Sequence, residues 1–285
     1  MNNFMKKTCF FIVLILFINI STVYGFSSTE PNFYEGFLVL DTDRDAPLPK
    51  RFRDIPSLNI SGSAEFVPSQ VMDIKKAINK PNIFIVDLRQ ESHGFLNDIA
   101  VSYYSPDRLL NNGFSSEDTL ADEIEKFGNI KLKSTENIYN KRGALLQTIT
   151  VSNSQIEEKL VQSSGMNYAL FATRDGHIPS PAVTDSFVNF VKITPETTHL
   201  HFHCDHGEGR TTLFMSMFQM MKESNVKSLE EILKEQLDAG GIILTYDTTR
   251  AEFLKDFYNY TKENSKNNFE TPFSVWSSKS SQSKY

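Results

Sequence analysis

The sequence predicts an α/β protein with a mainly parallel central sheet flanked by helices. Between residues 83 and 264, short runs rich in β-branched and aromatic residues alternate with segments whose apolar residues recur every three or four positions. This alternation is typical of parallel strands joined by crossover helices. The chain has 285 residues, 40% of them hydrophobic and 22% charged, which suits one large or two small globular domains with a substantial core.

The first half of the chain predicts a helix, a strand and a second helix, at residues 69–78, 83–88 and 116–127. Ser69 and Ser116 are suitable N-caps, because serine oxygens accept hydrogen bonds from the first backbone N–H groups of a helix. Two further segments, 33–60 and 130–151, are extended or β-leaning. We expect them to form a small strand subdomain together.

The second half predicts two more strands among five helices. The expected strands are residues 166–172 and 199–203, and the expected helices are residues 154–163, 183–191, 211–222, 229–237 and 250–264. Gly240 and Gly241 follow one of these helices and provide a stop signal for it. The polar segment 265–285 is expected to be a flexible tail, so that a single domain spans residues 26–264.

The N-terminus has the pattern of a secretory signal peptide. Lys6 and Lys7 precede an apolar run, and small residues around Gly25 suit a cleavage site. An uncleaved membrane anchor is the alternative, but the apolar run at 8–23 is short for a membrane span. We therefore expect cleavage of residues 1–25, export to the periplasm or medium, and no stable membrane insertion afterwards.

The charge balance limits the possible ligands. The formal net charge is −6, and nucleic-acid binding would need a broad basic face instead. Any anionic ligand must therefore be held locally. Without the leader, Cys204 is the single remaining cysteine, so no intramolecular disulfide can form in the exported chain.

The residues that carry chemistry follow the strand predicted at 199–203, in the sequence HCDHGEGRTT (residues 203–212). Cys204 and Arg210 are separated by five residues, among them Gly207 and Gly209. Glycines in such a turn allow successive backbone N–H groups to point into one concavity, and the helix that follows adds its positive end. This pattern predicts a phosphate-binding loop that favours the thiolate form of Cys204.

The loop pattern assigns a role to each of its polar residues. Cys204 is the expected nucleophile, and the planar guanidinium of Arg210 can hold two phosphoryl oxygens. Thr211 is expected to donate a hydrogen bond to the sulfur, and His203 to organise the loop. The remaining loop residues are expected to contact the substrate: Asp205, His206, Gly207, Glu208 and Gly209. The lysine of a nucleotide-binding P-loop is absent, which disfavours a kinase or NTPase.

Three other interpretations of the same residues remain open. The Cys204–Arg210 spacing could arise by chance, or the loop could bind phosphate without catalysis. A metal site is the third interpretation, because several candidate ligands lie close together in sequence: His199, His201, His203, Cys204 and His206. This spacing is too crowded for a usual zinc site, so we expect no metal cofactor.

Hydrolysis of a phosphate monoester also requires a general acid. Asp175 is the best candidate, because it lies in the loop TRDGHIPSP (residues 173–181) that follows a predicted strand. The alternative is that Asp175 and Gly176 simply form a turn. Asp185 is a weaker rival within a predicted helix, and His177 could orient the substrate.

The chain resembles the protein-tyrosine-phosphatase-like cysteine phytases, which are bacterial inositol-phosphate phosphatases. The resemblance spans about residues 51–264 and is carried by six short segments: VDLRQESHG (86–94), SGS (61–63), GMNY (165–168), ATRD (172–175), HFHC (201–204) and GG (240–241). It implies a phosphatase domain with a small partial β-barrel, no cofactor, and hydrolysis of an inositol polyphosphate through a phosphocysteine intermediate.

The resemblance also implies outer substrate contacts. Asp87 and Arg89 would border the active site, although they could equally form a structural ion pair, and Arg53 would contact outlying phosphates. A deep pocket with basic walls around Arg53 and Arg89 would favour inositol phosphates, whereas a flat rim with an aromatic clamp would favour phosphotyrosine. A phosphoinositide or phosphotyrosine phosphatase acting as a secreted effector is the alternative, and a metal-binding exported protein is a different class.

The chain departs from the family pattern at three places. Arg174 is an apparent insertion just before the expected acid. Glu208 and Asp205 place negative charge near the pocket mouth, and residues 242–249 contain no basic side chain. Like charges repel, so a highly phosphorylated ring would bind less tightly here than in relatives with more basic residues.

Overall fold

The computed structural model describes residues 36–282, and its central layer is a five-stranded sheet. The strands lie in the order β10-β4-β11-β3-β2, with bounds Asn167–Thr173, Ile83–Arg89, His199–His203, Ile60–Ser63 and Arg53–Ile55. The first four strands run parallel, and β2 is antiparallel to β3 at the edge. This confirms the predicted α/β class with a mainly parallel central sheet.

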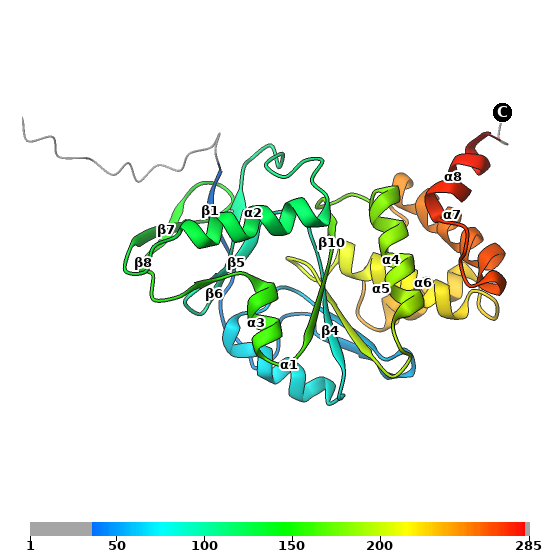
Figure 1. Ribbon diagram of the computed structural model, residues 1–285, viewed down its shortest axis with the longest axis horizontal. Coiled ribbons are helices and arrows are strands. Elements are labelled where there is room, and N and C mark those ends of the chain that lie inside the picture. Colours follow the sequence, from blue (N-terminus) through cyan, green and yellow to red (C-terminus); the bar gives the residue numbers. More distant parts are fainter. Residues whose placement is uncertain (1–35, 283–285) are drawn as a thin grey trace, which may run out of the picture.

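Helices cover both faces of this sheet. They are α1 (Val71–Ile78), α2 (Ser116–Asn129), α3 (Glu157–Ser163), α4 (Pro181–Ile193), α5 (Gly209–Glu223), α6 (Leu229–Asp238), α7 (Thr248–Asn264) and α8 (Phe273–Gln282). Figure 1 shows α4 to α8 gathered at one end of the molecule. Short 3-10 helices at Pro56–Leu58, Pro68–Gln70 and Ser265–Asn267 complete the elements.

The alternation of side chains along β4 creates two cores. Ile83 and Ile85 pack with α1 and α3, whereas Val86 and Leu88 pack with α4, α5 and α7. Because successive strand residues point to opposite faces, a strand covered on both sides is apolar at nearly every position. The carboxyl ends of the parallel strands all reach one edge of the sheet, where the loops that follow them meet.

A second sheet of six strands lies at the opposite end from α4 to α8 (Figure 1). Its order is β8-β7-β1-β6-β5-β9, with bounds Leu145–Thr150, Thr135–Tyr139, Phe37–Thr42, Ile99–Tyr104, His93–Leu96 and Ser154–Gln155. The segments that form this sheet differ in part from the expected ones, 33–60 and 130–151. Residues 53–63 join the central sheet, because β3 pairs with β11, and the hairpin 93–104 takes their place. The partial barrel stays a prediction.

The C-terminal segment differs from the expected flexible polar tail. Residues 273–282 form α8, and Phe269 and Phe273 are buried. The ring centroid of Tyr260 lies 5.4 Å from that of Phe273 and 5.7 Å from that of Trp276. Three aromatic side chains thus anchor a segment whose overall composition is polar, and the prediction for residues 265–282 is wrong.

The start of α2 also differs from the prediction by one residue. Ser115 is the N-cap, since its Oγ accepts from Asp118 N at 3.1 Å and the Asp118 side chain accepts from Ser115 N. Ser116 instead places its Oγ 3.0 Å from Ala172 N.

The N-terminal predictions cannot be compared with the structure. The predicted signal peptide, residues 1–25, lies outside the described residues. None of the helices in the described part of the chain combines the length and apolar character that crossing a membrane requires.

Candidate active site

Cys204 lies where the most central of the parallel strands gives way to a helix. It is the first residue after β11 and is 3% exposed, and α5 begins five residues later, at Gly209. The Oγ1 of Thr211 donates a hydrogen bond to its Sγ at 3.1 Å. The first turn of α5 leaves backbone N–H groups without helical partners, and the helix dipole is positive at this end. Cys204 thus lies at the positive end of a helix, with a hydrogen-bond donor on its sulfur.

Gly207 is required by the shape of the loop, whereas Gly209 is not. Gly207 has φ +68, and a Cβ there would lie 2.4 Å from Ala64 N and 2.5 Å from Ser63 C. At Gly209 the nearest atom to a Cβ would be Arg250 Nη2, at 3.7 Å. The tight turn at Gly207 lets the loop fit against the end of β3, and it is the position that only glycine can occupy without strain.

The guanidinium of Arg210 is already oriented by the loop after β4 and by the end of β10. Its Nη1 donates to Glu91 Oε2 at 2.7 Å and to Thr173 O at 3.0 Å, and its Nη2 donates to Glu91 Oε1 at 2.8 Å. Burial raises the pKa of Glu91, but Arg210 and Arg89 outweigh this effect and lower the pKa to about 2. The bidentate ion pair fixes the plane of the guanidinium beside the loop.

Asp175 lies next to this arginine. Its Oδ1 is 3.5 Å from Arg210 Nη2, and its Oδ2 accepts from Arg108 Nη1 at 2.9 Å. The loop is steadied by Arg250 Nη2, which donates to Gly176 O at 3.3 Å, and His177 Nδ1 lies 2.9 Å from the backbone oxygen of Asp175. The structure therefore brings the candidate acid to the edge of the phosphate loop.

The rival acid is elsewhere. Asp185 lies on α4, and its Oδ1 accepts from Ser274 N at 3.0 Å. This contact ties α4 to the start of α8. Its place in the fold thus favours Asp175 as the acid.

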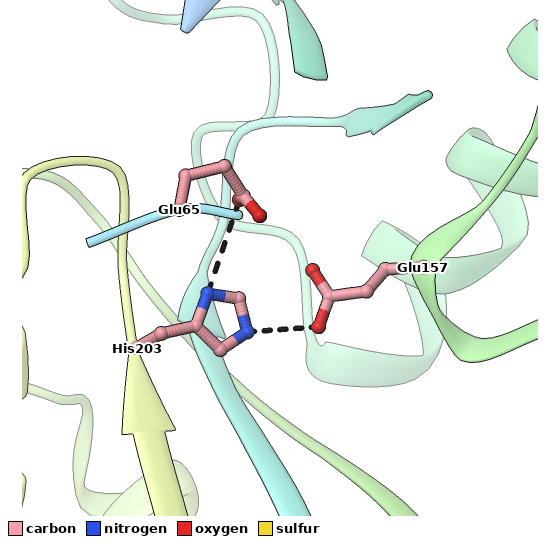
Figure 2. Close-up of side chains that lie close together, drawn as sticks. All are labelled: Glu65, Glu157 and His203. Atoms are coloured by element: carbon pink, nitrogen blue, oxygen red, sulfur yellow. Dashed lines mark hydrogen bonds and ion pairs between the residues drawn. The ribbon is translucent and has the colours of Figure 1, made fainter. Parts of the chain in front are cut away.

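His203 lies between two buried glutamates, as Figure 2 shows. Its Nε2 is 2.8 Å from Glu157 Oε1, and its Nδ1 is 3.9 Å from Glu65 Oε2. Burial lowers the pKa of His203, but Glu157 and Glu65 have the larger, opposite effect and raise it to about 9. The imidazole is therefore protonated at neutral pH and has no free position for another proton, which suits the expected organising role.

Arg53 and Arg89 are buried, at 6% and 0% exposure, and neither contributes a free basic wall. Arg53 Nη1 donates to Gly207 O at 2.9 Å and so supports the loop from behind. The burial of Arg53 lowers its pKa to about 10, against the opposing effect of Cys204.

Arg89 is the centre of a buried ionic cluster. Its guanidinium lies 3.0 Å from Asp41, 2.7 Å from Glu65 and 3.0 Å from Glu91. Because Glu91 also binds Arg210, Arg89 belongs to the support of the phosphate loop.

Asp87 is likewise internal. It is fully buried, and its Oδ2 accepts from Tyr168 at 2.7 Å and lies 3.2 Å from His93 Nε2. Burial raises its pKa, but His93 and His203 outweigh this and lower it. The structural ion pair that the sequence left open for this residue is therefore formed with histidine rather than with Arg89.

The negative charges of the loop are neutralised locally. Asp205 Oδ2 lies 2.5 Å from Lys141 Nζ and 3.1 Å from His206 Nδ1. Glu208 forms an ion pair with Arg51. These partners reduce the repulsion of an anionic substrate that the sequence alone suggested.

Five residues of the site had no role in the sequence prediction: Glu65, Glu91, Arg108, Lys141 and Glu157. Glu91 stands in the segment 86–94, but composition does not show that it meets an arginine 119 positions away. Arg108 and Lys141 come from loops of no distinctive pattern. Only the fold brings them to the loops that contain Cys204 and Asp175.

Two buried groups in the described part of the chain have ligand atoms close enough to hold a metal ion. They are Glu65, Glu157 and His203, and Asp87, His93 and Glu123. In both groups the histidine faces carboxylates as an ion pair. The other histidines considered as ligands are engaged differently, since His199 Nε2 and His201 Nδ1 lie 2.7 and 2.8 Å from Ser61 Oγ.

A family model and solved structures indicate one family. The sequence model of the PTP-like phytase family matches residues 86–222, and the description of this family reads "Inositol hexakisphosphate". The structure of a PTP-like phytase from Bdellovibrio bacteriovorus is 30% identical, with a TM-score of 0.73 over 85% of this chain and 94% of that one.

Larger proteins are also similar. A tandemly repeated PTP-like phytase from Mitsuokella multacida is 30% identical with a TM-score of 0.78, over 87% of this chain and 50% of that one, and a PTP-like myo-inositol phosphatase from the same organism was solved with myo-inositol-(1,3,4,5)-tetrakisphosphate. Effector protein hopD2 of Pseudomonas syringae pv. tomato is 26% identical over 216 residues, which is 68% of this chain and 46% of hopD2. The chain thus spans about half the length of these relatives.

Proposed function

Because the chain belongs to the PTP-like phytase family, we propose that it is a cysteine-dependent phosphatase that hydrolyses phosphate monoesters of inositol polyphosphates. The observation that carries the proposal is the grouping of Cys204, Arg210 and Asp175 at one edge of the central sheet, with Asp175 Oδ1 3.5 Å from Arg210 Nη2. The inositol tetrakisphosphate bound by the Mitsuokella phosphatase supports this substrate class.

In the first step, the Cys204 thiolate attacks the phosphorus atom. An S–P bond forms, and the P–O bond to the substrate alcohol breaks. Asp175 gives its proton to the departing oxygen, so that an alcohol and not an alkoxide leaves. Arg210 and the N–H groups at the start of α5 bind the equatorial oxygens, where negative charge gathers in the transition state.

In the second step, water hydrolyses the phosphocysteine. Asp175, now a carboxylate, takes a proton from the water as it attacks phosphorus, and the S–P bond breaks. The electron pair returns to Cys204 as a thiolate, and inorganic phosphate leaves. The 3.1 Å hydrogen bond from Thr211 stabilises the departing sulfur anion.

The proposal is tested by phosphate release from three substrates: inositol hexakisphosphate, a phosphoinositide and a phosphotyrosine peptide. Wild type is compared with Cys204→Ser, which keeps the loop but lacks the nucleophile. We expect release from the inositol phosphate by wild type, and binding without turnover by the serine variant. Equal turnover by both proteins would remove Cys204 from the mechanism.

The same assay decides between substrate classes. The similarity to effector protein hopD2 is compatible with a phosphatase that acts on a phosphoprotein or a phosphoinositide after delivery. A preference of at least tenfold in kcat/KM for the peptide or the lipid would replace inositol polyphosphate as the substrate.

We also propose that the protein is exported by its N-terminal segment. The proposal is supported by Lys6 and Lys7 ahead of the apolar run that ends before Gly25. N-terminal sequencing of the protein recovered from periplasm and medium is expected to begin at Phe26. An intact N-terminus in the membrane fraction would favour the uncleaved anchor.

A further inference from the structure

A small pocket opens between the six-stranded sheet and the loop of Asp175. It is lined by the candidate acid, by Asp205 of the phosphate loop and by basic side chains. Arg89 is fully buried, whereas Arg108, Lys141 and Arg174 come from three other segments and are exposed or half-buried. The pocket therefore lies beside Asp175 and Asp205, and its exposed basic groups come from segments other than the phosphate loop.

Arg174 is the basic group whose role the fold leaves open. It is the apparent insertion ahead of Asp175, and it lines the pocket. Its Nε is buried and has no hydrogen-bond partner among residues 36–282. Asp107, in the nearby turn, accepts from Ser105 Oγ at 2.5 Å and from Leu109 N at 3.0 Å, both at its Oδ1. These hydrogen bonds, together with the charge of Arg174, lower the pKa of Asp107. The Nε–H of Arg174 is thus a donor without a protein acceptor in the described part of the chain.

Arg108 is held in place by the same turn. Its backbone has φ +56, a left-handed conformation, and its N–H donates to Ser105 O at 2.9 Å. Its guanidinium and the Asp175 carboxylate are both about half exposed, at 55% and 52%. An ion pair this exposed is weak, so an incoming dianion can compete for Arg108.

The carboxylates of the pocket do not cancel these two arginines. Asp205 is paired with Lys141 and His206, and Glu91 is paired with Arg210 and Arg89. Asp175 has Arg210 as a second partner, at 3.5 Å. If Arg108 exchanges Asp175 for a substrate oxygen, the acid remains beside the phosphate loop with one oxygen free.

We propose that Arg108 and Arg174 form a subsite for a second phosphate group of the substrate, next to the phosphate that lies over Cys204. The inference rests on the proposed function and narrows it to substrates that carry two neighbouring phosphates. Binding of the second phosphate takes Arg108 from Asp175 and frees Oδ2 to face the leaving oxygen. Arg108 and Arg174 thus select substrates by binding the second phosphate, and Arg108 also positions the acid.

The test compares kcat and KM for two inositol bisphosphates, one with adjacent phosphates (4,5) and one with opposite phosphates (1,4), and for phenyl phosphate. Wild type is expected to favour the adjacent isomer by about tenfold in kcat/KM, the value of one charge-assisted contact. Arg174→Gln and Arg108→Gln are each expected to reduce this ratio about tenfold, and the lysine variants to restore part of it. For Arg108→Gln, part of the loss is expected in kcat.

Arg44→Gln is the matched control, because it also removes one arginine charge, but outside the pocket. Arg44 Nη2 forms an exposed ion pair with Asp73 Oδ2 at 3.1 Å. It is expected to keep the wild-type ratio. An unchanged ratio in both pocket variants, or an equal loss on every substrate, would overturn the subsite.

The failure of the proposed function gives a different result. In that case wild type hydrolyses phenyl phosphate but neither bisphosphate. Calorimetry on the Cys204→Ser protein then decides the subsite with pyrophosphate and phosphate as probes. The Cys204→Ser protein is compared with the double variant that also carries Arg174→Gln. Weaker binding of pyrophosphate, but not of phosphate, by the double variant supports the subsite. Equal binding of both probes by the two proteins contradicts it.

Discussion

The carboxylate of Glu91 accepts two hydrogen bonds from the guanidinium of Arg210, at 2.7 and 2.8 Å. Glu91 comes from the loop after β4, and Arg210 from the first turn of α5. The fork of the arginine is therefore oriented before any phosphate arrives, and its orientation depends on a residue that does not belong to the phosphate loop.

Glu91→Gln is expected to lower kcat/KM on an inositol phosphate by about 100-fold, because a small displacement of a catalytic group has effects of this size. Steady-state kinetics on the folded variant measures the loss. Glu125→Gln, on the exposed side of α2, is the control. A glutamine variant with wild-type kinetics would show that Arg210 needs no such support.

Asp175→Asn is expected to reduce turnover most for substrates whose leaving group must be protonated. The rate on an alkyl phosphate should fall by about 10²- to 10⁴-fold, and the rate on p-nitrophenyl phosphate much less, because nitrophenolate leaves without protonation. Asp185→Asn is the control, because it removes a charge away from the site while its amide oxygen can still accept from Ser274 N. If the loss follows Asp185 instead, the acid has been assigned to the wrong loop.

The ion pairs of His203 predict a loss of stability at alkaline pH. The pKa of His203 is about 9 in the folded protein, against an ordinary value of 6.5. The folded state therefore binds the proton more tightly, and the stabilisation is complete below pH 6.5 and is lost as the pH rises to 9. The difference corresponds to roughly 3 kcal/mol of unfolding free energy.

Urea unfolding at several pH values between 7 and 9.5 measures this loss. Burial and the charge of Glu157 raise the pKa of Glu65 to about 7. Glu65 therefore lowers the stability as the pH rises towards 7, mostly before this range begins. Glu157→Gln is expected to be less stable at pH 7 and to show a smaller further decrease up to pH 9.5. Parallel pH curves for both proteins would mean that Glu157 does not set the charge of His203.

Gly207→Ala is expected to destabilise the fold by about 1–3 kcal/mol, because it places a Cβ 2.4 Å from Ala64 N at φ +68. Thermal or urea unfolding measures the change. Gly209→Ala, where the nearest atom would be 3.7 Å away, is the comparison and should lose much less stability. A reversed order would show that the turn relaxes at Gly207.

The local part of the site is predictable from sequence. The spacing of Cys204 and Arg210 around two glycines defines the loop, and the strand periodicity places it at the end of β11. Asp175 follows another parallel strand, so its arrival at the same edge is a consequence of the fold class. These features depend on residues close together in the chain.

The supporting residues are not predictable in this way. Arg53 and Arg89 suggest basic pocket walls by type, but their burial and their partners depend on the pairing of β2, β3 and β4. A sequence does not show which carboxylates surround an arginine. The same reason explains α8, where three aromatic residues in a polar segment find a surface on α7 that periodicity does not reveal.

The contact of Asp41 with Arg89 connects the six-stranded sheet to the phosphate loop. Asp41 is on β1, and through Arg89 and Glu91 its charge acts on Arg210. A shortened version of the protein that starts after β1 would keep every residue of the phosphate loop, yet Arg89 would lose one of its counterions. We therefore expect a fragment that lacks Phe37–Thr42 to be less active than the full chain, although these residues lie far upstream of the nucleophile.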